Sequence, residues 1–455
     1  MPVTGNGGTR LASTKLSVVP TSEQGEAIQM ELSFWAATDV GKKREHNEDN
    51  FLVDKKLRLF IVADGMGGHA SGEVASHIAV HEMRRVVEED RPTIEAYANG
   101  KAETQDVLTV LEEAVLAACT AVFQKGQDEA DKRGMGTTLS ALLVVKDRGF
   151  IAHVGDSRIY LVRKNQVVQL TEDHSLVNEL IRRGKVTKET LATSPYASFK
   201  NAVTRAVGVY ERVQVDTIDF DILPGDQFLL CSDGLSHYLD DDKTLEILAS
   251  EDDVTGLPQK FIDLANSGGG HDNITAISLR VHRDVDDAQS QRSEELNRRI
   301  DVLRHMPLFR YLTYREVMRV LNLTTAVDYE PGQIVLQEGD PGDDLFIILR
   351  GKIRLHKDET FITYLESGAH LGEMALVDRT PRSASATAEE KSRILVLSRK
   401  DFYEIIRKHP PLAVKLLWSF VQVLADRLRK TTADLSGARQ EAGAVELPSD
   451  VLFDE

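Results

Sequence analysis

The chain has 455 residues, of which 42% are hydrophobic and 28% charged, and its formal net charge is −17. These proportions are ordinary for a globular protein of two or three domains, and the acidic balance excludes a general nucleic-acid-binding protein. No apolar run approaches the roughly 18 residues of a membrane span, and the N-terminus lacks the apolar core of a secretory signal. The two cysteines, Cys119 and Cys231, are too few for a disulfide framework, so we expect a reducing, cytoplasmic compartment.

Composition divides the chain into five segments. Residues 1–30 are rich in Gly, Ser and Thr, and we expect them to be disordered. A dense pattern of apolar residues over 31–283 predicts a first domain, and a polar, helical linker over 284–300 leads to a second domain over 301–430. The last residues, 431–455, are acidic and are expected to be mobile.

The first domain combines strand and helix patterns. Two segments, 75–86 and 107–122, carry apolar residues at helical spacing. Short apolar runs predict strands over residues 58–63, 140–145, 150–154, 159–162, 227–231 and 274–281. Strands interleaved with such helices indicate a layered α/β or α+β domain.

Three of the predicted strands carry an aspartate at one end. The run 60–63 ends in Asp64 and Gly65, and the run 228–232 ends in Asp233 and Gly234. Asp272 precedes the strand that begins at residue 274. Each site alone is also typical of a turn, because Asp-Gly is a common hairpin signal.

An antiparallel course of the third strand would bring the three aspartates to one edge of a sheet. Glu48, Asp49 and Asp156 would then raise the cluster to about five or six carboxylates, which repel one another unless they are neutralised. Divalent cations with oxygen ligands relieve this repulsion, and Mg²⁺ or Mn²⁺ suits an all-oxygen site. The spacing of Cys and His does not indicate zinc.

The order and content of these motifs resemble the metal-dependent type 2C Ser/Thr protein phosphatases, in their bacterial form. The matching segments are residues 44–49, 64–69, 134–138, 155–158, 232–234 and 270–273. The resemblance covers about residues 31–283 and implies a β-sandwich flanked by helices, with the metals at one edge. It also implies that metal-activated water attacks the phosphomonoester of a phosphorylated Ser/Thr protein.

The resemblance further implies a role for each acidic residue. Asp64 would bridge two metals, and the Gly65 carbonyl would complete one coordination shell. Asp233 and Asp272 would hold the first metal, and Glu48 would hold the second directly or through water. A third metal of the kind seen in bacterial members is implied at Asp156 together with Asp233.

Two residues are implied in the reaction itself, because Arg44 would clamp the substrate phosphate and Asp49 would orient metal-bound waters. Animal members of the family place a histidine straight after Asp-Gly, where this chain has Met66. His69 lies three residues further on, but a lone histidine is more often structural, and metal-bound water is the expected acid. Residues 173–205, with His174 and Thr204, correspond to a variable flap that meets substrate.

A second constellation lies in residues 371–386. Residues 372–376 can form a short helical turn whose free N–H groups point at an anion, while Arg382 and Glu373 suit a phosphate and a hydroxyl. Without further context, Glu373 is equally typical of a helix N-terminus, and Arg382 is equally typical of a solvent-exposed loop.

The wider segment 301–430 resembles the cyclic-nucleotide-binding domain of protein kinase regulatory subunits and of the catabolite activator protein. The supporting segments are residues 303–309, 331–335, 338–340, 345–348 and Gly351, and the family fold is a β-roll with flanking helices. The resemblance implies that Arg382 pairs with the cyclic phosphate and Glu373 accepts the ribose hydroxyl, while backbone at Gly372, Ala375 and Ser383 completes the cradle. Ser383 fits both cyclic GMP and cyclic AMP readers, and we favour cyclic AMP.

The last helix follows Pro410 and Pro411 and carries two apolar stripes. One stripe consists of Val414, Leu417, Val421, Leu424 and Leu428, and the other of Leu416, Phe420 and Val423. One stripe would pack on the β-roll, and the other would pair with a second subunit as a short coiled coil. The sequence leaves monomer and homodimer open.

These features predict a Ser/Thr phosphoprotein phosphatase that is regulated by a cyclic nucleotide. Leu296, Ile300 and Leu303 would share a helical face that couples the two domains. Two alternatives stay open at this point. One is a nucleotide-binding scaffold with an inactive phosphatase domain, and the other is an active phosphatase whose nucleotide domain only dimerises.

Overall fold

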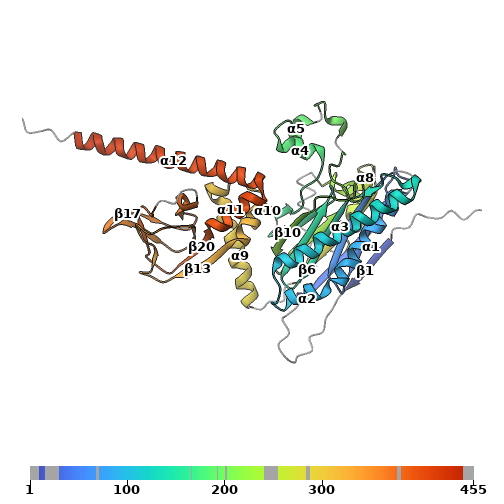
Figure 1. Ribbon diagram of the computed structural model, residues 1–455, viewed down its shortest axis with the longest axis horizontal. Coiled ribbons are helices and arrows are strands. Elements are labelled where there is room, and N and C mark those ends of the chain that lie inside the picture. Colours follow the sequence, from blue (N-terminus) through green and yellow to red (C-terminus); the bar gives the residue numbers. More distant parts are fainter. Residues whose placement is uncertain are drawn as a thin grey trace, which may run out of the picture. The chain divides into compact units, whose positions relative to one another are not determined.

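The computed structural model describes residues 10–15, 30–67, 71–164, 166–191, 193–199, 202–239, 255–282, 287–376 and 381–443. The chain divides into two compact units, Met1–Ser290 and Gln291–Glu455 (Figure 1). Within the described residues, no helix combines the length and the apolar character that crossing a membrane requires.

Two six-stranded sheets form the first unit. In spatial order, one sheet consists of β1 (Arg10–Lys15), β2 (Leu32–Asp39), β12 (Ile274–Val281), β11 (Gln227–Cys231), β8 (Arg158–Arg163) and β9 (Gln166–Gln169). The other consists of β10 (Asp216–Asp221), β7 (Arg148–Val154), β6 (Leu139–Val145), β4 (Leu59–Met66) and β3 (Asp49–Asp54), with β5 (Gly136–Thr137) paired to the end of β4. Antiparallel pairing throughout these sheets explains why strand ends from distant parts of the chain meet at one edge.

The sheets pack face to face and are covered by helices on their outer faces. Phe34 of β2 meets Phe60 of β4 with ring centroids 5.5 Å apart, so these residues face the space between the sheets. On the outer face of β4, Leu59 and Ile61 are fully buried beneath the helices α1 and α3 (Figure 1). Burial on both faces explains why residues 59–63 of β4 are all apolar instead of alternating with polar residues.

The helices of the first unit vary greatly in length. They are α1 (Ser71–Glu89), α2 (Arg91–Ala98), α3 (Thr104–Asp128), α4 (Leu176–Arg182), α5 (Lys188–Leu191), α6 (Asp233–Ser236) and α8 (Leu257–Ser267), with short 3₁₀ turns η1 (Ala130–Lys132) and η2 (Ala197–Phe199). Phe261 and Ile262 of α8 pack against the outer face of the β12 sheet. The resulting helix–sheet–sheet–helix arrangement is the β-sandwich flanked by helices that the sequence predicts.

The second unit has two four-stranded antiparallel sheets. One contains β13 (Thr324–Tyr329), β20 (Ser392–Ser398), β15 (Asp344–Arg350) and β18 (His370–Leu371), and the other β14 (Ile334–Leu336), β19 (Ser385–Ala388), β16 (Ile353–Lys357) and β17 (Thr360–Leu365). The flanking helices are α9 (Asp287–His305), α10 (Tyr314–Asn322), α11 (Arg399–Lys408) and α12 (Pro410–Gly443), with 3₁₀ turns η3 (Pro307–Phe309) and η4 (Glu373–Leu376). This sheet-rich unit with flanking helices confirms the predicted β-roll.

Two predicted boundaries need correction. Residues 10–15, predicted to be disordered, form β1, because the edge of β2 offers unpaired backbone groups that a polar segment can satisfy. The tail predicted to be mobile from residue 431 continues α12 as far as Gly443, and residues 444–455 lie outside the described residues. The division between the two units falls at Gln291, inside the predicted linker over 284–300, and Glu295 of α9 pairs with Arg393 of β20 at 3.1 Å.

Candidate active site and nucleotide cradle

Asp64 is held at the end of β4 by its backbone. Its N–H donates to the Thr138 hydroxyl at 2.8 Å, and its carbonyl accepts the Thr137 hydroxyl at 2.9 Å. Asp49 is the cross-strand partner of Asp64 in the pairing of β3 with β4. Two carboxylates from neighbouring strands therefore lie side by side at one sheet edge.

Glycines allow Glu48 to approach the same edge. A Cβ atom on Gly65 would lie 2.1 Å from the Gly72 carbonyl oxygen, and one on Gly72 would lie 2.7 Å from the Glu48 carboxyl carbon. The Gly65 N–H donates to the Glu48 carbonyl at 3.2 Å, and the Gly72 N–H donates to Glu48 Oε1 at 3.3 Å. Only residues without side chains fit these close backbone approaches.

Asp233 and Asp272 come from the other sheet. β11 ends at Cys231 and β12 begins at Ile274, and the antiparallel pairing of Cys231 with Ala276 brings both aspartates to one end. Asn273 joins this end to Glu48, since its Oδ1 accepts the Glu48 N–H at 2.9 Å. The antiparallel arrangement that the sequence analysis required is therefore present.

Burial raises the pKa values of these carboxyl groups. Burial is the main reason that the pKa of Asp49 rises to about 7 and that of Asp156 to about 7. The pKa of Asp64 lies well above its usual range because the group is buried and faces the charges of Asp49, Asp233 and Asp156. The pKa of Asp233 is also raised, again chiefly by burial, and its carboxyl group shares a hydrogen bond with that of Asp64. Burial, with repulsion between the carboxylates as a further cause, marks the cluster as a site that needs compensating positive charge.

Arg44 supplies one compensating charge. Its guanidinium donates to Asp272 Oδ2 at 2.8 Å, and its side chain is 47% exposed. Glu48 and Asp64 also act on it electrostatically. Arg44 therefore lies at the open side of the carboxylate cluster, where an anionic substrate would meet it.

The donor set fits divalent cations. Asp49 Oδ1 and Asp233 Oδ1 are buried without a hydrogen-bond partner within the described part of the chain. A buried carboxylate oxygen without a partner is costly, and an oxygen-coordinated cation satisfies it. Among the described residues, no three His, Cys, Asp or Glu side chains already form a ligand cage, so the predicted ligand set stays a prediction.

The structure thus brings together the predicted first-unit residues Arg44, Glu48, Asp49, Asp64, Gly65, Asp156, Asp233 and Asp272. His69, for which the sequence favoured a structural role, lies outside the described residues. Sequence reasoning missed Ser232 and Thr275, whose hydroxyls both donate to Asp49 Oδ2 at 2.7 Å. The available signal was their position in the sequence, since Ser232 directly precedes Asp233 and Thr275 follows Asp272 by three residues.

The second candidate site surrounds η4. Glu373 is only 2% exposed, and the preceding Gly372 has a φ of +78°, which favours glycine. The guanidinium of Arg382 donates to the Gly372 carbonyl at 3.3 Å and to the Asp344 carbonyl at 3.0 Å. Burial of the guanidinium lowers the pKa of Arg382. The predicted helical turn is confirmed, and Ser383 is exposed beside Arg382.

Comparison with known proteins identifies both units. Residues 40–265 match the family model for protein phosphatase 2C, and residues 326–409 match that for the cyclic nucleotide-binding domain. The serine/threonine phosphatase stp of Listeria monocytogenes is 40% identical over 251 residues, which are 54% of this chain and 94% of that protein. The chain belongs to the protein phosphatase 2C family. It is a protein serine/threonine phosphatase that carries a cyclic-nucleotide-binding domain.

Solved structures are similar over the same half of the chain. The serine/threonine phosphatase PstP/Ppp of Mycobacterium tuberculosis is 34% identical, covers 55% of this chain and 99% of its own, and has a TM-score of 0.49. The catalytic domain of PstP in complex with two manganese ions is 34% identical, covers 56% and 100%, and has a TM-score of 0.47.

In the phosphatase domain, His174 links the predicted flap to the loop that carries Asp156. The Gly155 N–H donates to His174 Nδ1 at 3.1 Å, and the His174 N–H donates to the Gly155 carbonyl at 2.8 Å. The far end of the flap returns to the same residue, since the Thr204 N–H donates to the His174 carbonyl at 2.7 Å. Arg205 lies 3.1 Å from His174 Nε2. His174 therefore fixes both ends of the flap beside a predicted metal ligand.

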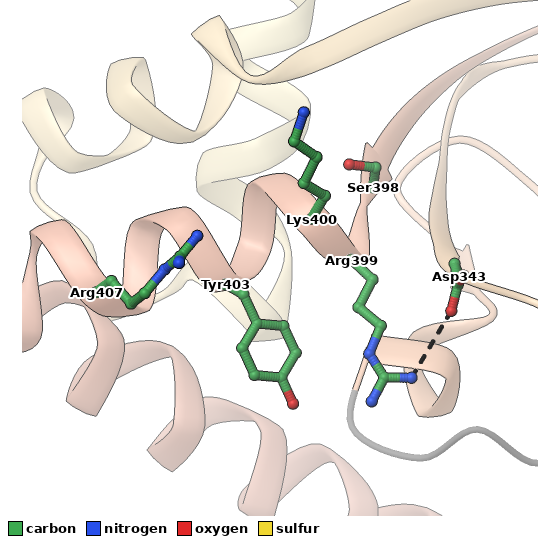
Figure 2. A pocket seen from close by; sticks show the side chains of 6 residues that line it. All are labelled: Asp343, Ser398, Arg399, Lys400, Tyr403 and Arg407. Atoms are coloured by element: carbon green, nitrogen blue, oxygen red, sulfur yellow. Dashed lines mark ion pairs between the residues drawn. The ribbon is translucent and has the colours of Figure 1, made fainter.

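In the nucleotide-binding domain, a cavity of about 600 Å³ lies beside the cradle. Its lining comes from α11 and from the residues next to β15: Asp343, Ser398, Arg399, Lys400, Tyr403 and Arg407 (Figure 2). Arg399 pairs with Asp343 across it at 3.7 Å. Neither Glu373 nor Arg382 lines this cavity, so it is separate from the predicted nucleotide contacts.

Proposed function

We propose that a cyclic nucleotide bound to the second unit regulates the phosphatase activity of the first. The catalytic part rests on one observation, the buried carboxylates with raised pKa values beside Arg44. The regulatory part rests on Glu373 and Arg382, which lie in the cradle of a domain whose family binds cyclic nucleotides. Both cysteines are free and buried, which supports a cytoplasmic location.

We assign Mg²⁺ or Mn²⁺ to the carboxylate cluster, with two ions and a third at Asp156. The residues that would hold them are Glu48, Asp64, Gly65, Asp156, Asp233 and Asp272. When bound, such cations supply a nucleophile at neutral pH and neutralise charge on the phosphoryl oxygens. The burial of these oxygens supports the assignment, because it keeps bulk water from screening the site.

The protein's own side chains would bind and orient the substrate. Arg44 is exposed enough to leave Asp272 and to bind two oxygens of a phosphate with its planar guanidinium. Asp49 accepts two hydroxyl hydrogen bonds at Oδ2, so its Oδ1 remains available to orient a water molecule. Ser232 and Thr275 hold the Asp49 carboxylate in place, so a water molecule bound at Oδ1 would have a hydrogen-bond acceptor in a fixed position.

Nucleotide binding would exchange the partners of Arg382. Its present partners are two backbone carbonyls, and a cyclic phosphate would replace them with a charge-assisted pair. Glu373 would accept the ribose hydroxyl, and backbone groups at Gly372, Ala375 and Ser383 would complete the cradle. We propose cyclic AMP as the ligand. Regulation then requires that the ligand bind one arrangement of the flanking helices more tightly than another.

One titration tests these proposals together. Mn²⁺-dependent hydrolysis of an aryl phosphate is followed while cyclic AMP or cyclic GMP is added, and calorimetry on the same samples measures binding. We expect binding and a changed rate with cyclic AMP. Binding without a change in rate would overturn regulation, and hydrolysis without any binding would leave the second unit a role in association only. Binding without hydrolysis would make the chain a nucleotide-binding scaffold.

We also propose that the chain forms a homodimer through α12. One side of this helix packs on its own domain, where Leu416 and Phe420 are 1% and 3% exposed. The opposite side carries large apolar residues that remain exposed, which is typical of an interaction surface.

A further inference from the structure

Helix α1 carries two histidines on its solvent-facing side. Its opposite side is fixed, since Ala75, Ala79 and Met83 are fully buried in the core that α1 shares with β4 and α3. His77 and His81 are exposed and four residues apart, so they lie one above the other on successive turns of the helix. Packing of the buried side therefore holds both rings at the surface, next to each other.

The two imidazole rings are already close together. Their centroids lie 4.2 Å apart, and their planes are inclined by 55°. Imidazole nitrogens bind Zn²⁺ at about 2.0–2.1 Å, so two nitrogens on one ion lie roughly 3 Å apart. Small side-chain rotations bring rings at the observed separation to that geometry, and their exposure leaves room for such rotations. Two histidines at this spacing on one helix face are also the zinc-ligand pair of a known metal-binding motif.

The surroundings keep the ring of His81 neutral. Its pKa is lowered, chiefly by partial burial and further by the charges of His77 and Arg84. A neutral imidazole keeps a nitrogen lone pair at pH 7, and this is the form that binds a metal ion. Two protonated rings at this distance would repel each other, whereas two neutral rings can share one ion.

The donor atoms select the kind of ion. Imidazole nitrogen suits Zn²⁺, Ni²⁺ and Cu²⁺, whereas Mg²⁺ and Mn²⁺ prefer oxygen ligands. Glu73 lies one turn before His77, but the described side chains include no preassembled group of three His, Cys, Asp or Glu ligands. We infer that His77 and His81 chelate one divalent transition-metal ion of this class, with water completing its coordination shell. This site goes beyond the proposed function and does not depend on it.

The histidine pair is separate from the carboxylate cluster, although one helix serves both. Ser76, which directly precedes His77, is fully buried and donates its hydroxyl to the Glu48 carbonyl at 2.7 Å. That contact lies on the inward side of α1, and the two histidines lie on the outward side. Substitutions at His77 and His81 should therefore leave the basal phosphatase rate unchanged.

A copper titration tests the two ligands. The untagged full chain is kept in excess Mg²⁺, which fills oxygen-ligand sites and gives no electron paramagnetic resonance signal. Bound Cu²⁺ should show hyperfine coupling to two imidazole nitrogens in the wild type. His77→Ala and His81→Ala should each lose this pattern and weaken Cu²⁺ binding about 100-fold or more, because the second ring coordinates intramolecularly. Binding that neither substitution weakens would overturn the site.

A register control keeps the composition of the helix. Combining His81→Glu with Glu82→His moves the second histidine one residue along α1, away from the side of His77, and should bind Cu²⁺ as weakly as His81→Ala. His305→Ala removes an exposed histidine of α9 that has no histidine four residues away, and it should bind as the wild type does. An unchanged phosphatase rate shows that each variant is folded. Tight binding by the register control would overturn chelation by the pair.

Hydrogen exchange shows whether Zn²⁺ occupies the same site. In excess Mg²⁺, added Zn²⁺ should slow exchange of the amide hydrogens of residues 78–85 in the wild type, because the ion ties two turns of α1 together. The amides of α3, in the same domain, are the internal reference. His81→Ala should exchange at the same rate with and without Zn²⁺. A wild-type α1 that exchanges equally fast in both conditions would overturn binding of Zn²⁺ by the pair.

Discussion

The two functional regions are assembled over very different distances along the chain. The proposed phosphatase site draws on residues from Arg44 to Asp272, which meet only because strand ends of two sheets converge. The proposed nucleotide cradle lies within residues 372–376 and 382–383, around one short turn. The phosphatase site therefore depends on the folding of its whole domain. The nucleotide cradle is local, so single substitutions should change its ligand binding. Variants should reveal this difference.

The largest effect is expected at Asp64. Asp64→Asn should lower kcat/KM for an aryl phosphate by at least about 100-fold, because it removes the carboxylate assigned to both cations. Urea unfolding in the presence of a chelator should show a midpoint no lower than that of the wild type, since an amide costs less to bury among carboxylates. Asp263→Asn, an exposed carboxylate on α8, is the control. If Asp64→Asn retained its activity, the assignment of Asp64 as a metal ligand would be wrong.

An effect on folding stability, and not on the reaction rate, is expected at Asp226. Arg163 donates to both carboxylate oxygens of Asp226, at 2.8 and 2.6 Å, and the two side chains are 7% and 2% exposed. Asp226→Ala should destabilise the phosphatase domain by about 3–5 kcal/mol, because it leaves a buried charge without its carboxylate. Denaturant unfolding followed by phosphatase activity measures this loss.

The same variant tests whether the two regions are separate. Cyclic nucleotide binding by Asp226→Ala, measured by calorimetry, should match that of the wild type, because the second unit has its own core. Glu95→Ala, which removes an exposed pair with Arg91, should change stability little. Loss of nucleotide binding in Asp226→Ala would show that the second unit depends on the first.

At the cradle, Arg382→Ala should weaken cyclic AMP binding by about 10-fold or more, since hydrogen bonds to charged groups contribute about 1.5–3 kcal/mol. The ligand effect on the phosphatase rate should disappear, while the rate without ligand stays the same. Calorimetry and aryl phosphate hydrolysis measure the two quantities. Arg354→Ala, a half-exposed arginine on β16, should bind as the wild type does. If cyclic AMP still changed the phosphatase rate of Arg382→Ala, the assignment of Arg382 to the cyclic phosphate would be contradicted.

Sequence patterns predicted the parts of this protein that hydrophobic burial determines. The strands 227–231 and 274–281 match β11 and β12 residue for residue, and their antiparallel register followed from the need to gather the aspartates. The two apolar stripes of α12 were also visible, because helical spacing separates them. The structure decides which stripe is buried, since this depends on where α11 lies.

Other features depend on contacts that no local pattern encodes. β1 carries few large apolar residues, and it pairs with β2 through backbone hydrogen bonds that most sequences can make. The bonds from Ser232 and Thr275 to Asp49 join opposite sheets, so they depend on how the sheets pack. The role of His174 likewise required the path of the flap, which begins and ends at that residue.

The smallest expected effect concerns this histidine and separates positioning from chemistry. His174→Ala removes the acceptor for the Gly155 N–H, one residue before Asp156, and the contact with Arg205. A neutral hydrogen bond contributes about 1 kcal/mol, so kcat/KM for a phosphopeptide should fall roughly fivefold. Because the flap is expected to meet the peptide and not a small aryl group, most of this loss should appear in KM for the phosphopeptide. His174→Asn should recover most of the rate, since its Oδ1 can accept the same N–H. Equal losses on both substrates, without recovery by asparagine, would show that His174 acts on the metal loop and not through the flap.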